Sequence, residues 1–314
     1  MEMKASTLIH HLQIAVRCRE SLSLNTNAMR LANGRGDGLE GLIIDRFNKH
    51  FVIYILDNFW QQHKDVICNF LSEHFDVQYL ISKDRSVSPI LEDVLISRQD
   101  SKTIVEENGL QFHVDLNDHL NQGLFLDMRK NRALVASYAK DKAVLNCFAY
   151  TCSFGVYCRK FGASRLTNVD ISSKILKKGQ ENYRLNHLPV GRSEFVQDHA
   201  VQYMQRVARR NNFFDMIILD PPSFSRYQGK VFSVKKDMPF MIEKALLALK
   251  ASGILFISTN LSSIFRPQLE EWVYVAAKKV QRKITGVNRL GQDIDFRRSG
   301  LMKESFLSAL LVKI

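Results

Sequence analysis

An acidic residue followed by two prolines marks the C-terminal half of the chain. Residues 216–219 are all apolar, as in a strand that is buried on both faces of a parallel sheet. Pro221 and Pro222 lack the N–H that a sheet ladder needs, so the strand is expected to end before them. Asp220 would then stand at the carboxyl end of a strand, where open α/β sheets place their chemistry.

Two more acidic residues follow two other predicted strands. Asp170 follows the strand 166–169, and Asp198 follows the strand 194–197. A carboxylate at Asp170 suits hydrogen bonds from ribose hydroxyls, whereas Asp198 could accept from an adenine amino group. Each acid alone could instead cap the helix that follows it. Three acids after three strands favour a nucleotide-like cofactor over three coincidental caps.

The loop after the first strand of this region is expected to hold the charged end of the cofactor. That strand covers 144–147, and the residues after it lead into a helix N-terminus. No Gly-x-Gly-x-x-Gly follows the strand, which makes a nicotinamide dehydrogenase the least favoured enzyme class. The glycine-containing stretch 33–38 precedes a strand rather than a helix, so it is interpreted as a turn.

Alternating strands and helices must position these residues. From residue 127 onward the pattern predicts strand 144–147, helix 153–161, strand 166–169, helix 172–186, strand 194–197, helix 199–210, strand 214–219, helix 237–250 and strand 253–258. This alternation predicts a doubly wound parallel sheet. Two strands, 283–290 and 305–312, follow with no crossover helix between them. Such an antiparallel ending is typical of class I methyltransferases, so the predicted fold is α/β with a Rossmann-like methyltransferase sheet.

The first third of the chain predicts a separate, smaller domain. Residues 1–24 are expected to form a helical segment, and residues 25–117 a small α/β domain with a hairpin that turns near Asn108 and Gly109. This small domain is a candidate for RNA binding. The methyltransferase domain is then expected to cover residues 118–314.

Composition and charge narrow the class of partner. The 314 residues carry a formal net charge of +12, which attracts polyanions. Paired basic residues recur at Arg209-Arg210, Lys235-Lys236, Lys278-Lys279, Arg282-Lys283 and Arg297-Arg298. Together they favour a nucleic acid as partner, although no aromatic-interleaved recognition motif accompanies them.

Other features argue against further classes of protein. No apolar run approaches the ~20 residues that a membrane span needs, and the N-terminus lacks a signal-peptide layout, so a cytoplasmic protein with no membrane partner is expected. The five cysteines include no close pair with metal-ligand spacing, so neither a disulfide framework nor a metal site is expected. Cys147 and Cys158 are interpreted as ordinary buried residues.

Three segments carry a family resemblance. They are residues 123–132 (GLFLDMRKNR), 145–151 (LNCFAYT) and 220–224 (DPPSF). In this order and spacing they resemble the S-adenosylmethionine-dependent RNA methyltransferases of the RlmI and RlmK/L type, which modify bases of large-subunit ribosomal RNA. The likeness runs from about Met29 to the C-terminus and is strongest over residues 118–260.

The resemblance implies a role for each matching position. The cofactor would be S-adenosylmethionine, whose carboxylate arginines can hold through paired hydrogen bonds. The implied cofactor contacts are Asp127, Arg129, Arg132, Asn146, Phe148, Tyr150, Thr151, Ser153, Asp170, Ile171, Asp198 and Asp220. The residues that would face both the sulfonium and the target base are Asp220, Pro221, Pro222 and Phe224.

The chain departs from the family pattern in two places. Cys152 stands where the family usually has glycine. If the backbone needs a positive φ there, a side chain costs roughly 1–2 kcal/mol, which would weaken cofactor binding. The family's N-terminal RNA-binding domain of the PUA type is expected to be absent or truncated.

The target atom is inferred from what the chain must supply. Cytosine carbon 5 needs a cysteine thiolate, which in RlmI-type members follows the fifth strand. The corresponding segment here, 256–261, has no cysteine. Guanine nitrogen 7 carries a free lone pair and needs only placement, and the segments 220–224 and 258–260 look closer to the RlmK half, a guanine-N7 methyltransferase. Guanine N7 is therefore favoured and an exocyclic amine comes next, with Phe224 stacked on the base.

Two other functions stay open at this point. A non-catalytic relative that binds RNA or the cofactor is suggested by Cys152 and by the reduced N-terminus. A small-molecule methyltransferase is the third possibility, and weak, salt-insensitive binding to RNA would favour it.

Overall fold

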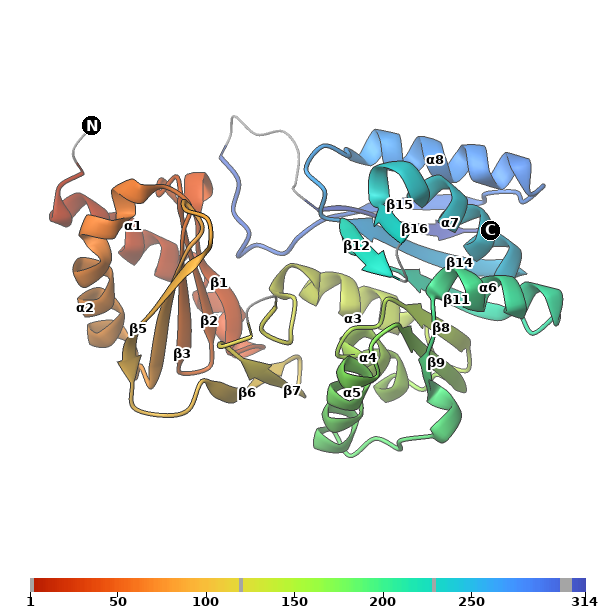
Figure 1. Ribbon diagram of the computed structural model, residues 1–314, viewed down its shortest axis with the longest axis horizontal. Coiled ribbons are helices and arrows are strands. Elements are labelled where there is room, and N and C mark those ends of the chain that lie inside the picture. Colours follow the sequence, from red (N-terminus) through yellow and green to blue (C-terminus); the bar gives the residue numbers. More distant parts are fainter. Residues whose placement is uncertain (1–2, 119–120, 228–229, 300–306) are drawn as a thin grey trace. The chain divides into compact units, whose positions relative to one another are not determined.

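The structure, a computed structural model, describes residues 3–118, 121–227, 230–299 and 307–314. Its contacts divide the chain into two compact units (Figure 1). Unit 1 holds Met1–Arg129 and Gln292–Lys303, and unit 2 holds Lys130–Gly291 and Glu304–Ile314. The division after residue 129 differs from the predicted boundary between residues 117 and 118, because the intervening segment bonds to unit 1. For example, Lys83 Nζ donates to the carbonyl of Asp118 at 3.1 Å.

Unit 2 is built on a seven-stranded sheet in the order β10-β9-β8-β11-β14-β16-β15. Its strands are β8 (Ala143–Cys147), β9 (Arg165–Asp170), β10 (Phe195–Gln197), β11 (Phe214–Leu219), β14 (Leu249–Thr259), β15 (Gly286–Leu290) and β16 (Ser308–Lys313). The first five of these run parallel, whereas β16 is antiparallel to both β14 and β15. The predicted doubly wound sheet with antiparallel C-terminal strands is confirmed.

Helices cover both faces of this sheet (Figure 1). They are α3 (Arg129–Ser137), α4 (Ser153–Lys160), α5 (Ser173–Leu185), α6 (Ala200–Arg209), α7 (Val234–Ala248) and α8 (Arg266–Lys279). The chain winds from β8 outward to β10 and then returns to β11 and β14. Because such crossovers are right-handed, this reversal puts α4 and α5 on one face and α6, α7 and α8 on the other. The second group shares one apolar core with β11 and β14.

A short antiparallel pair between β11 and α7 was not predicted. Its strands are β12 (Phe224–Tyr227) and β13 (Lys230–Ser233). The pair begins at the last residue of the Asp-Pro-Pro-Ser-Phe segment, and its four-residue strands are too short for a periodicity of two to be recognised.

Unit 1 contains a mixed five-stranded sheet in the order β1-β2-β3-β4-β5. Its strands are β1 (Ala28–Asn33), β2 (Leu42–Phe47), β3 (His50–Ile55), β4 (Tyr79–Asp84) and β5 (Leu91–Ser97), and a separate hairpin pairs β6 (Lys102–Glu107) with β7 (Leu110–Asp115). The predicted hairpin turn is confirmed, since Asn108 and Gly109 have φ of +52° and +72°. The predicted turn at 33–38 is also confirmed, because the short 3₁₀ helix Gly34–Asp37 joins β1 to β2. Strands β1 and β5 were not predicted.

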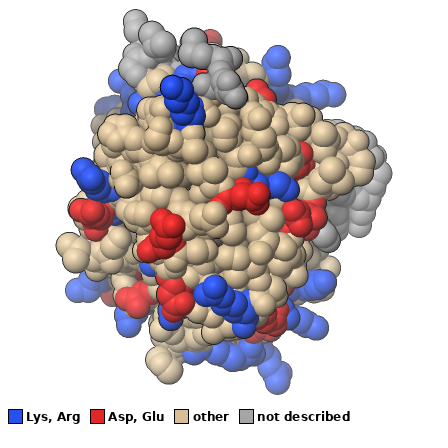
Figure 2. All heavy atoms as spheres, turned by 90° about the vertical axis from the view of Figure 1, so that its left-hand side faces the viewer, with Lys and Arg blue, Asp and Glu red and all other residues tan. Residues whose placement is uncertain are grey.

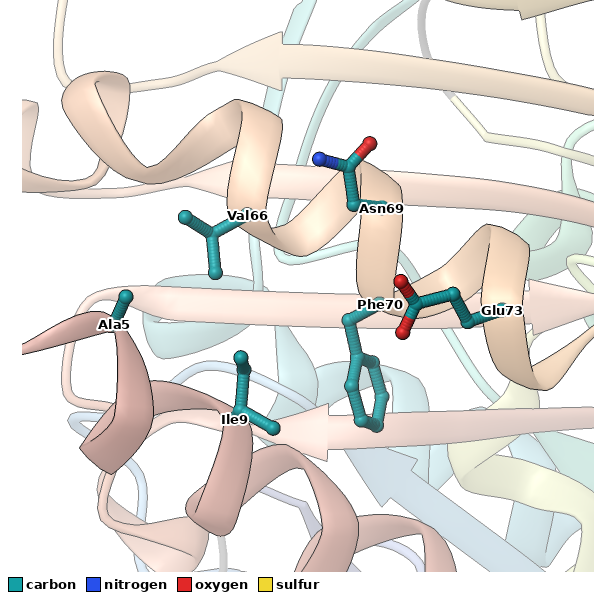
Figure 3. Close-up of a pocket in the computed structure, with 6 residues that line it drawn as sticks. All are labelled: Ala5, Ile9, Val66, Asn69, Phe70 and Glu73. Carbon is teal, nitrogen blue, oxygen red and sulfur yellow. The ribbon is translucent and has the colours of Figure 1, made fainter.

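Two helices, α1 (Ala5–Arg17) and α2 (Lys64–His74), pack on one face of this sheet. The predicted helical segment 1–24 is α1 followed by a 3₁₀ helix at Glu20–Leu24. Figure 3 shows a pocket between α1 and α2, and none of the predicted site residues lines it. Its lining residues are Ala5, Ile9, Val66, Asn69, Phe70 and Glu73. In the described part of the chain, no helix combines the length and the apolar character that crossing a membrane requires.

Ion pairs with two buried carboxylates, Asp37 and Asp295, attach the segment after β15 to the rest of unit 1. Arg129 Nη2 lies 2.6 Å from Asp295 Oδ1, and the Asp295 side chain is fully buried. Arg19 and Arg297 both pair with Asp37, at 2.7 and 3.0 Å. Removing one partner of a buried pair leaves a charge without compensation, which is strongly destabilising. These pairs explain why residues 292–303 belong to unit 1 although their neighbours on both sides belong to unit 2.

Candidate cofactor and base-binding site

The carboxyl ends of five parallel strands line up at one edge of the unit 2 sheet. Strand register pairs Gln197 with Asp170, Cys147 with Val169 and with Leu219, and Leu219 with Ile257. The residues that follow each strand therefore meet along this edge, which we call the carboxyl edge. It brings together the predicted residues of unit 2 that follow β8, β9, β10 and β11, as strand-end chemistry in such sheets requires.

The loop after β8 has an unusual backbone. Phe148, Tyr150 and Cys152 have φ of +56°, +49° and +59°, although none of them is glycine. Bulky residues adopt this left-handed region only where the surrounding structure enforces it, and such strain gathers at functional sites. Hydrogen bonds hold the loop here, because Ala149 N donates to the carbonyl of Val169 at 3.0 Å and Cys152 N donates to that of Ala149 at 2.8 Å.

Cys152 does require a positive φ, as the family's glycine at this position suggested. Its side chain is fully buried and points at Gly179 of α5, where an added Cβ would lie 2.4 Å from the Cys152 Sγ. The thiol thus fills a space that the missing side chain at Gly179 leaves open. The cost of left-handed backbone remains, but the side chain is packed against α5 within the protein.

A buried chain of amides supports this loop from below. Asn146 Nδ2 donates to Asn168 Oδ1 at 2.9 Å, and Asn168 Nδ2 donates to the Tyr183 hydroxyl at 3.0 Å. Gly155 makes room for this chain, since a Cβ there would lie 2.3 Å from Asn168 Oδ1. The Asn146 side chain is thus part of the interior support, and only 2% of the residue is exposed.

Of the other predicted site residues around the loop after β8, Thr151 is buried and the rest are partly accessible at the surface. The carbonyl of Thr151 accepts a hydrogen bond from Asn182 Nδ2 at 3.0 Å, and Thr151 itself is 2% exposed. Phe148, Tyr150 and Ser153 are half-buried at the carboxyl edge, where a bound molecule can reach them.

Asp170 connects the ends of β8 and β9. Its Oδ2 accepts from Tyr150 N and its Oδ1 from Ser172 N, both at 3.0 Å. Burial raises the pKa of the Asp170 carboxyl above its ordinary value, and backbone hydrogen bonds from Ser172, Tyr150 and Ile171 oppose the rise without cancelling it. A carboxylate has about four acceptor sites, so Asp170 retains capacity to accept from a ribose hydroxyl.

Asp198 and Ile171 extend the edge beyond Asp170. Asp198 Oδ1 accepts from His199 N at 2.7 Å, and Oδ2 forms an ion pair with Arg206 of α6. The carboxylate is therefore fixed in place. Ile171 is half-buried, and its carbonyl accepts from Gln197 Nε2 at 3.2 Å, which offers an apolar side chain beside the two acids.

Two side-chain hydrogen bonds join the segment after β11 to the last residues of β14 and to the loop that follows them. Ser258 Oγ donates to Asp220 Oδ1 at 2.6 Å, and Ser223 Oγ lies 2.6 Å from Asn260 Oδ1. The sequence of residues 258–260 resembles the RlmK half and lacks the cysteine of the RlmI type, but neither property predicts a bond to Asp220. That pairing depends on the register of β11 and β14.

The remaining residues of the Asp-Pro-Pro-Ser-Phe segment differ in exposure. Pro221 is buried and Pro222 is exposed, and the ring of Phe224 is 54% exposed. An aromatic ring presented next to a strand-end carboxylate can stack on a planar base.

The three predicted residues of the entry segment fall on different sides of the division. Asp127 and Arg129 belong to unit 1, whereas Arg132 belongs to unit 2, where it is 1% exposed. Arg129 uses its guanidinium within unit 1. Besides its pair with Asp295, its Nε contacts Asp293 at 3.1 Å and its Nη1 donates to the carbonyl of Ala28 at 2.9 Å. These contacts use three of the five N–H donors of the guanidinium and hold the side chain within unit 1.

The donor and acceptor groups at the carboxyl edge fit S-adenosylmethionine. A ribose diol needs a carboxylate acceptor such as Asp170, an adenine needs an apolar contact such as Ile171, and a sulfonium is stabilised by a nearby carboxylate such as Asp220. These are the residue types and positions that the sequence predicted, and their assignment to individual cofactor atoms stays a prediction.

Comparison with known proteins agrees with this geometry. Residues 80–296 match the model of the S-adenosylmethionine-dependent methyltransferase family. The chain is 31% identical over 297 residues to YwbD of Bacillus subtilis, a protein named as a ribosomal RNA large subunit methyltransferase, with 92% of this chain and 75% of YwbD covered. It is 30% identical over 299 residues to ribosomal RNA large subunit methyltransferase I of Tolumonas auensis, with 91% and 75% covered.

A solved structure shows the same architecture with a cofactor product bound. The methyltransferase SMU.776, complexed with SAH, superposes with a TM-score of 0.90 at 26% identity and covers 100% of this chain and 83% of its own. The cofactor predicted from the sequence is thereby confirmed as S-adenosylmethionine. A nearer likeness to the K type than to the I type stays a prediction. With a family model that covers most of the chain and relatives that align along its length, this protein belongs to the S-adenosylmethionine-dependent methyltransferases.

Proposed function

We propose that this protein methylates a base of large-subunit ribosomal RNA in the cytoplasm. The relatives named above act on this RNA according to their names, and they align with more than nine-tenths of the chain. The formal net charge of +12 supports a polyanionic substrate over a small molecule.

We further propose that the target atom is a base nitrogen, with guanine N7 first and an exocyclic amine next. The observation that carries this proposal is the pairing of Asp220 with Ser258, in the segment where a cytosine-C5 enzyme of the RlmI type needs its cysteine. The two cysteines nearest this edge, Cys147 and Cys152, are fully buried, and burial raises the pKa of both thiols. A thiol in that state is a poor source of the thiolate that carbon methylation requires.

In such a reaction the protein mainly positions the target base next to the methyl donor. S-adenosylmethionine, when bound, supplies a methyl group on a positively charged sulfur. Phe224 would stack on the target base, and Asp220, held by Ser258, would accept a hydrogen bond from the base edge. Because guanine N7 already carries a lone pair, positioning the base and excluding water are the main requirements. A base in a duplex would first have to be flipped out of the stack.

The direct test is to map modified bases in ribosomal RNA from cells with and without the protein. The proposal predicts one guanine whose borohydride- and aniline-induced cleavage, a signature of N7 methylation, disappears when the protein is absent. A lost bisulfite-resistant cytosine would overturn the nitrogen assignment, and an unchanged modification pattern would overturn the ribosomal RNA assignment.

A second measurement addresses the non-catalytic alternative. Calorimetry with S-adenosylmethionine should show binding at physiological cofactor concentrations, because Cys152 is packed against Gly179. Absence of binding would instead favour a relative that has lost catalysis.

A further inference from the structure

The positive charge of the protein resides in unit 2. Within the ranges of unit 2 the sequence has 28 Lys and Arg against 12 Asp and Glu, a formal charge of +16. Unit 1 has 16 basic and 20 acidic residues, a formal charge of −4. Figure 2 shows the face that carries α1 and α2, where uncharged residues dominate and acidic side chains stand among basic ones. Attraction of a polyanion therefore favours unit 2 over the small domain that the sequence offered as a candidate.

Two loops and a helix start meet at one point of the carboxyl edge. Ser223 Oγ contacts Asn260 Oδ1 at 2.6 Å, and the Ser223 carbonyl accepts from Val234 N, at the start of α7, at 3.2 Å. The loop after β11, the loop after β14 and the first turn of α7 are thus joined at Ser223. Residues that these three segments expose lie around the place where the target base is expected.

The loop after β14 presents an aromatic ring from a fixed backbone. Ile264 is 2% exposed, its N–H donates to the carbonyl of Leu261 at 2.9 Å, and its own carbonyl accepts from Ser308 Oγ at 2.9 Å. The next residue, Phe265, is 50% exposed and precedes α8. Since the anchored Ile264 fixes this turn, the ring of Phe265 is displayed at little additional cost in conformational entropy.

Basic side chains accompany the two exposed rings. Lys235 and Lys236 are exposed in the first turn of α7, directly after the strand that pairs with the segment of Phe224. Arg266 is half-buried and follows Phe265 as the first residue of α8. Aromatic rings for stacking and cations for phosphates are the two components that single-stranded RNA binding needs.

We infer that Phe224, Phe265, Lys235, Lys236 and Arg266 form an RNA-binding platform, on which Phe265 stacks against a nucleotide next to the target base. This inference rests on the proposed function, because it assigns the surface that delivers the RNA to the methyl-transfer site. The partner is RNA with at least one unpaired nucleotide beside the target, since a ring cannot stack on a base inside a duplex. Phe265 is then a positioning residue that acts on the RNA and not on the cofactor.

The stacking role of Phe265 can be tested against Phe161, a phenylalanine of nearly equal exposure. Phe265→Ala should weaken binding of a single-stranded fragment of the substrate RNA about 5- to 100-fold, measured by fluorescence anisotropy in the full chain. Phe161→Ala is the control, because Phe161 is 48% exposed at the C-terminal end of α4. The adjoining Gly162 accepts from Asp141 N just before β8, which places Phe161 at the opposite edge of the sheet. Phe265→Tyr should restore binding, and affinity for S-adenosylmethionine should stay unchanged in all three variants.

The contribution of the basic side chains to RNA binding is tested by substituting one pair of lysines at each edge of the sheet. The double substitution Lys235→Ala/Lys236→Ala should reduce the slope of log affinity against log salt by about 1 to 2. Lys278→Ala/Lys283→Ala removes the same charge at the other end of α8, where Arg282 Nη2 donates to the carbonyl of Leu249 at the start of β14. This control pair should leave the slope nearly unchanged.

The outcomes separate this inference from the proposed function. If the wild-type protein binds and methylates ribosomal RNA but Phe265→Ala behaves like Phe161→Ala, the platform is wrong while the function stands. If the wild type neither binds nor methylates RNA, the proposed function fails first. Equal loss of salt dependence in both lysine pairs would also overturn the platform, because it would show that the whole surface of unit 2 attracts RNA without a preferred edge.

Discussion

The two edges of the unit 2 sheet use left-handed backbone for different purposes. At the amino edge and the helix ends, the residues with positive φ include Asp141, Asn211, His187 and Gln281, each in a turn or just after a helix. Asn and Asp tolerate this region, and helices commonly end there. At the carboxyl edge the residues are Phe148, Tyr150 and Cys152, within one loop. The first edge uses the conformation to end helices, whereas the second maintains a strained loop where the cofactor is expected.

An aspartate lies near each end of strand β11, and the two aspartates differ in the same way as the two edges. Asp215 near its amino end accepts from Ala143 N and contacts Lys250 Nζ, both at 2.9 Å, and so links neighbouring strands. Asp220 beyond its carboxyl end accepts from Ser258 and stands beside the exposed Phe224. Residues of one type, five positions apart, thus serve structure at one edge and the predicted chemistry at the other.

Substitution of Asp220 should have the largest effect on activity. Asp220→Asn is expected to lower the methyl-transfer rate at least about 100-fold, because a positioned acceptor at the reacting base is lost. The unfolding midpoint in urea should change little. Asp215→Asn is the matched control and should keep the rate within about twofold. Similar rates in the two variants would show that the edges do not differ in function.

Asp170→Asn should mainly affect cofactor binding. Loss of a charged hydrogen-bond acceptor for the ribose is worth about 1.5–3 kcal/mol, which corresponds to roughly 10- to 100-fold in the dissociation constant of S-adenosylmethionine. Calorimetry on the two proteins measures this difference. Unchanged affinity would remove Asp170 from the cofactor site.

The raised pKa of Asp170 adds a pH dependence of defined sign. Burial raises the pKa of Asp170 in the folded protein, so the folded state binds the proton more tightly than the unfolded state does. The charged carboxylate therefore destabilises the fold at pH values above the folded pKa. This destabilisation is relieved as the pH falls through the folded pKa. Protonation at the same time removes an acceptor. Relative to Asp170→Asn, the wild type should therefore gain stability and lose cofactor affinity over the same acidic range.

Gly179→Ala should test the packing that supports the strained loop. The new Cβ would lie 2.4 Å from Cys152 Sγ, so the loop must shift, at a cost of about 1–3 kcal/mol in the free energy of unfolding. Cofactor affinity should fall as well. Combining the change with Cys152→Gly should recover most of both losses, because the clash then disappears. Additive effects in this double-mutant cycle would mean that the two residues are not coupled.

Asp215→Asn should have the smallest effect, and its dependence on pH is the informative part. Burial alone would raise the pKa of Asp215, but the hydrogen bond from Ala143 and the contact with Lys250 outweigh it, so the pKa is lowered. A lowered pKa contributes stability above the unfolded value that is lost as pH falls through the folded value. The wild type should exceed the variant by less than about 1 kcal/mol at neutral pH, and the difference should vanish in acid. Urea unfolding at a series of pH values measures it.

Local patterns in the sequence determined the fold of unit 2 and the positions of its acids. A strand buried on both faces must be continuously apolar, and proline must end it, so residues 216–222 define a strand end without reference to any other part of the chain. The alternation of strands and helices located Asp170 and Asp198 after their strands. The antiparallel ending of the sheet followed from the missing crossover helix, and the motifs then indicated the family and its cofactor.

Only the tertiary structure decided which side chains meet. Ser258 bonds to Asp220, Cys152 fits against Gly179, and Arg129 pairs with Asp295, over separations of up to 166 residues. Such contacts depend on strand register and on which helix face meets which loop, and neither leaves a periodic signal in the sequence. For the same reason, the membership of residues 292–303 in unit 1 and the exposure of Phe265 at the carboxyl edge could not be predicted from residue types and spacing alone.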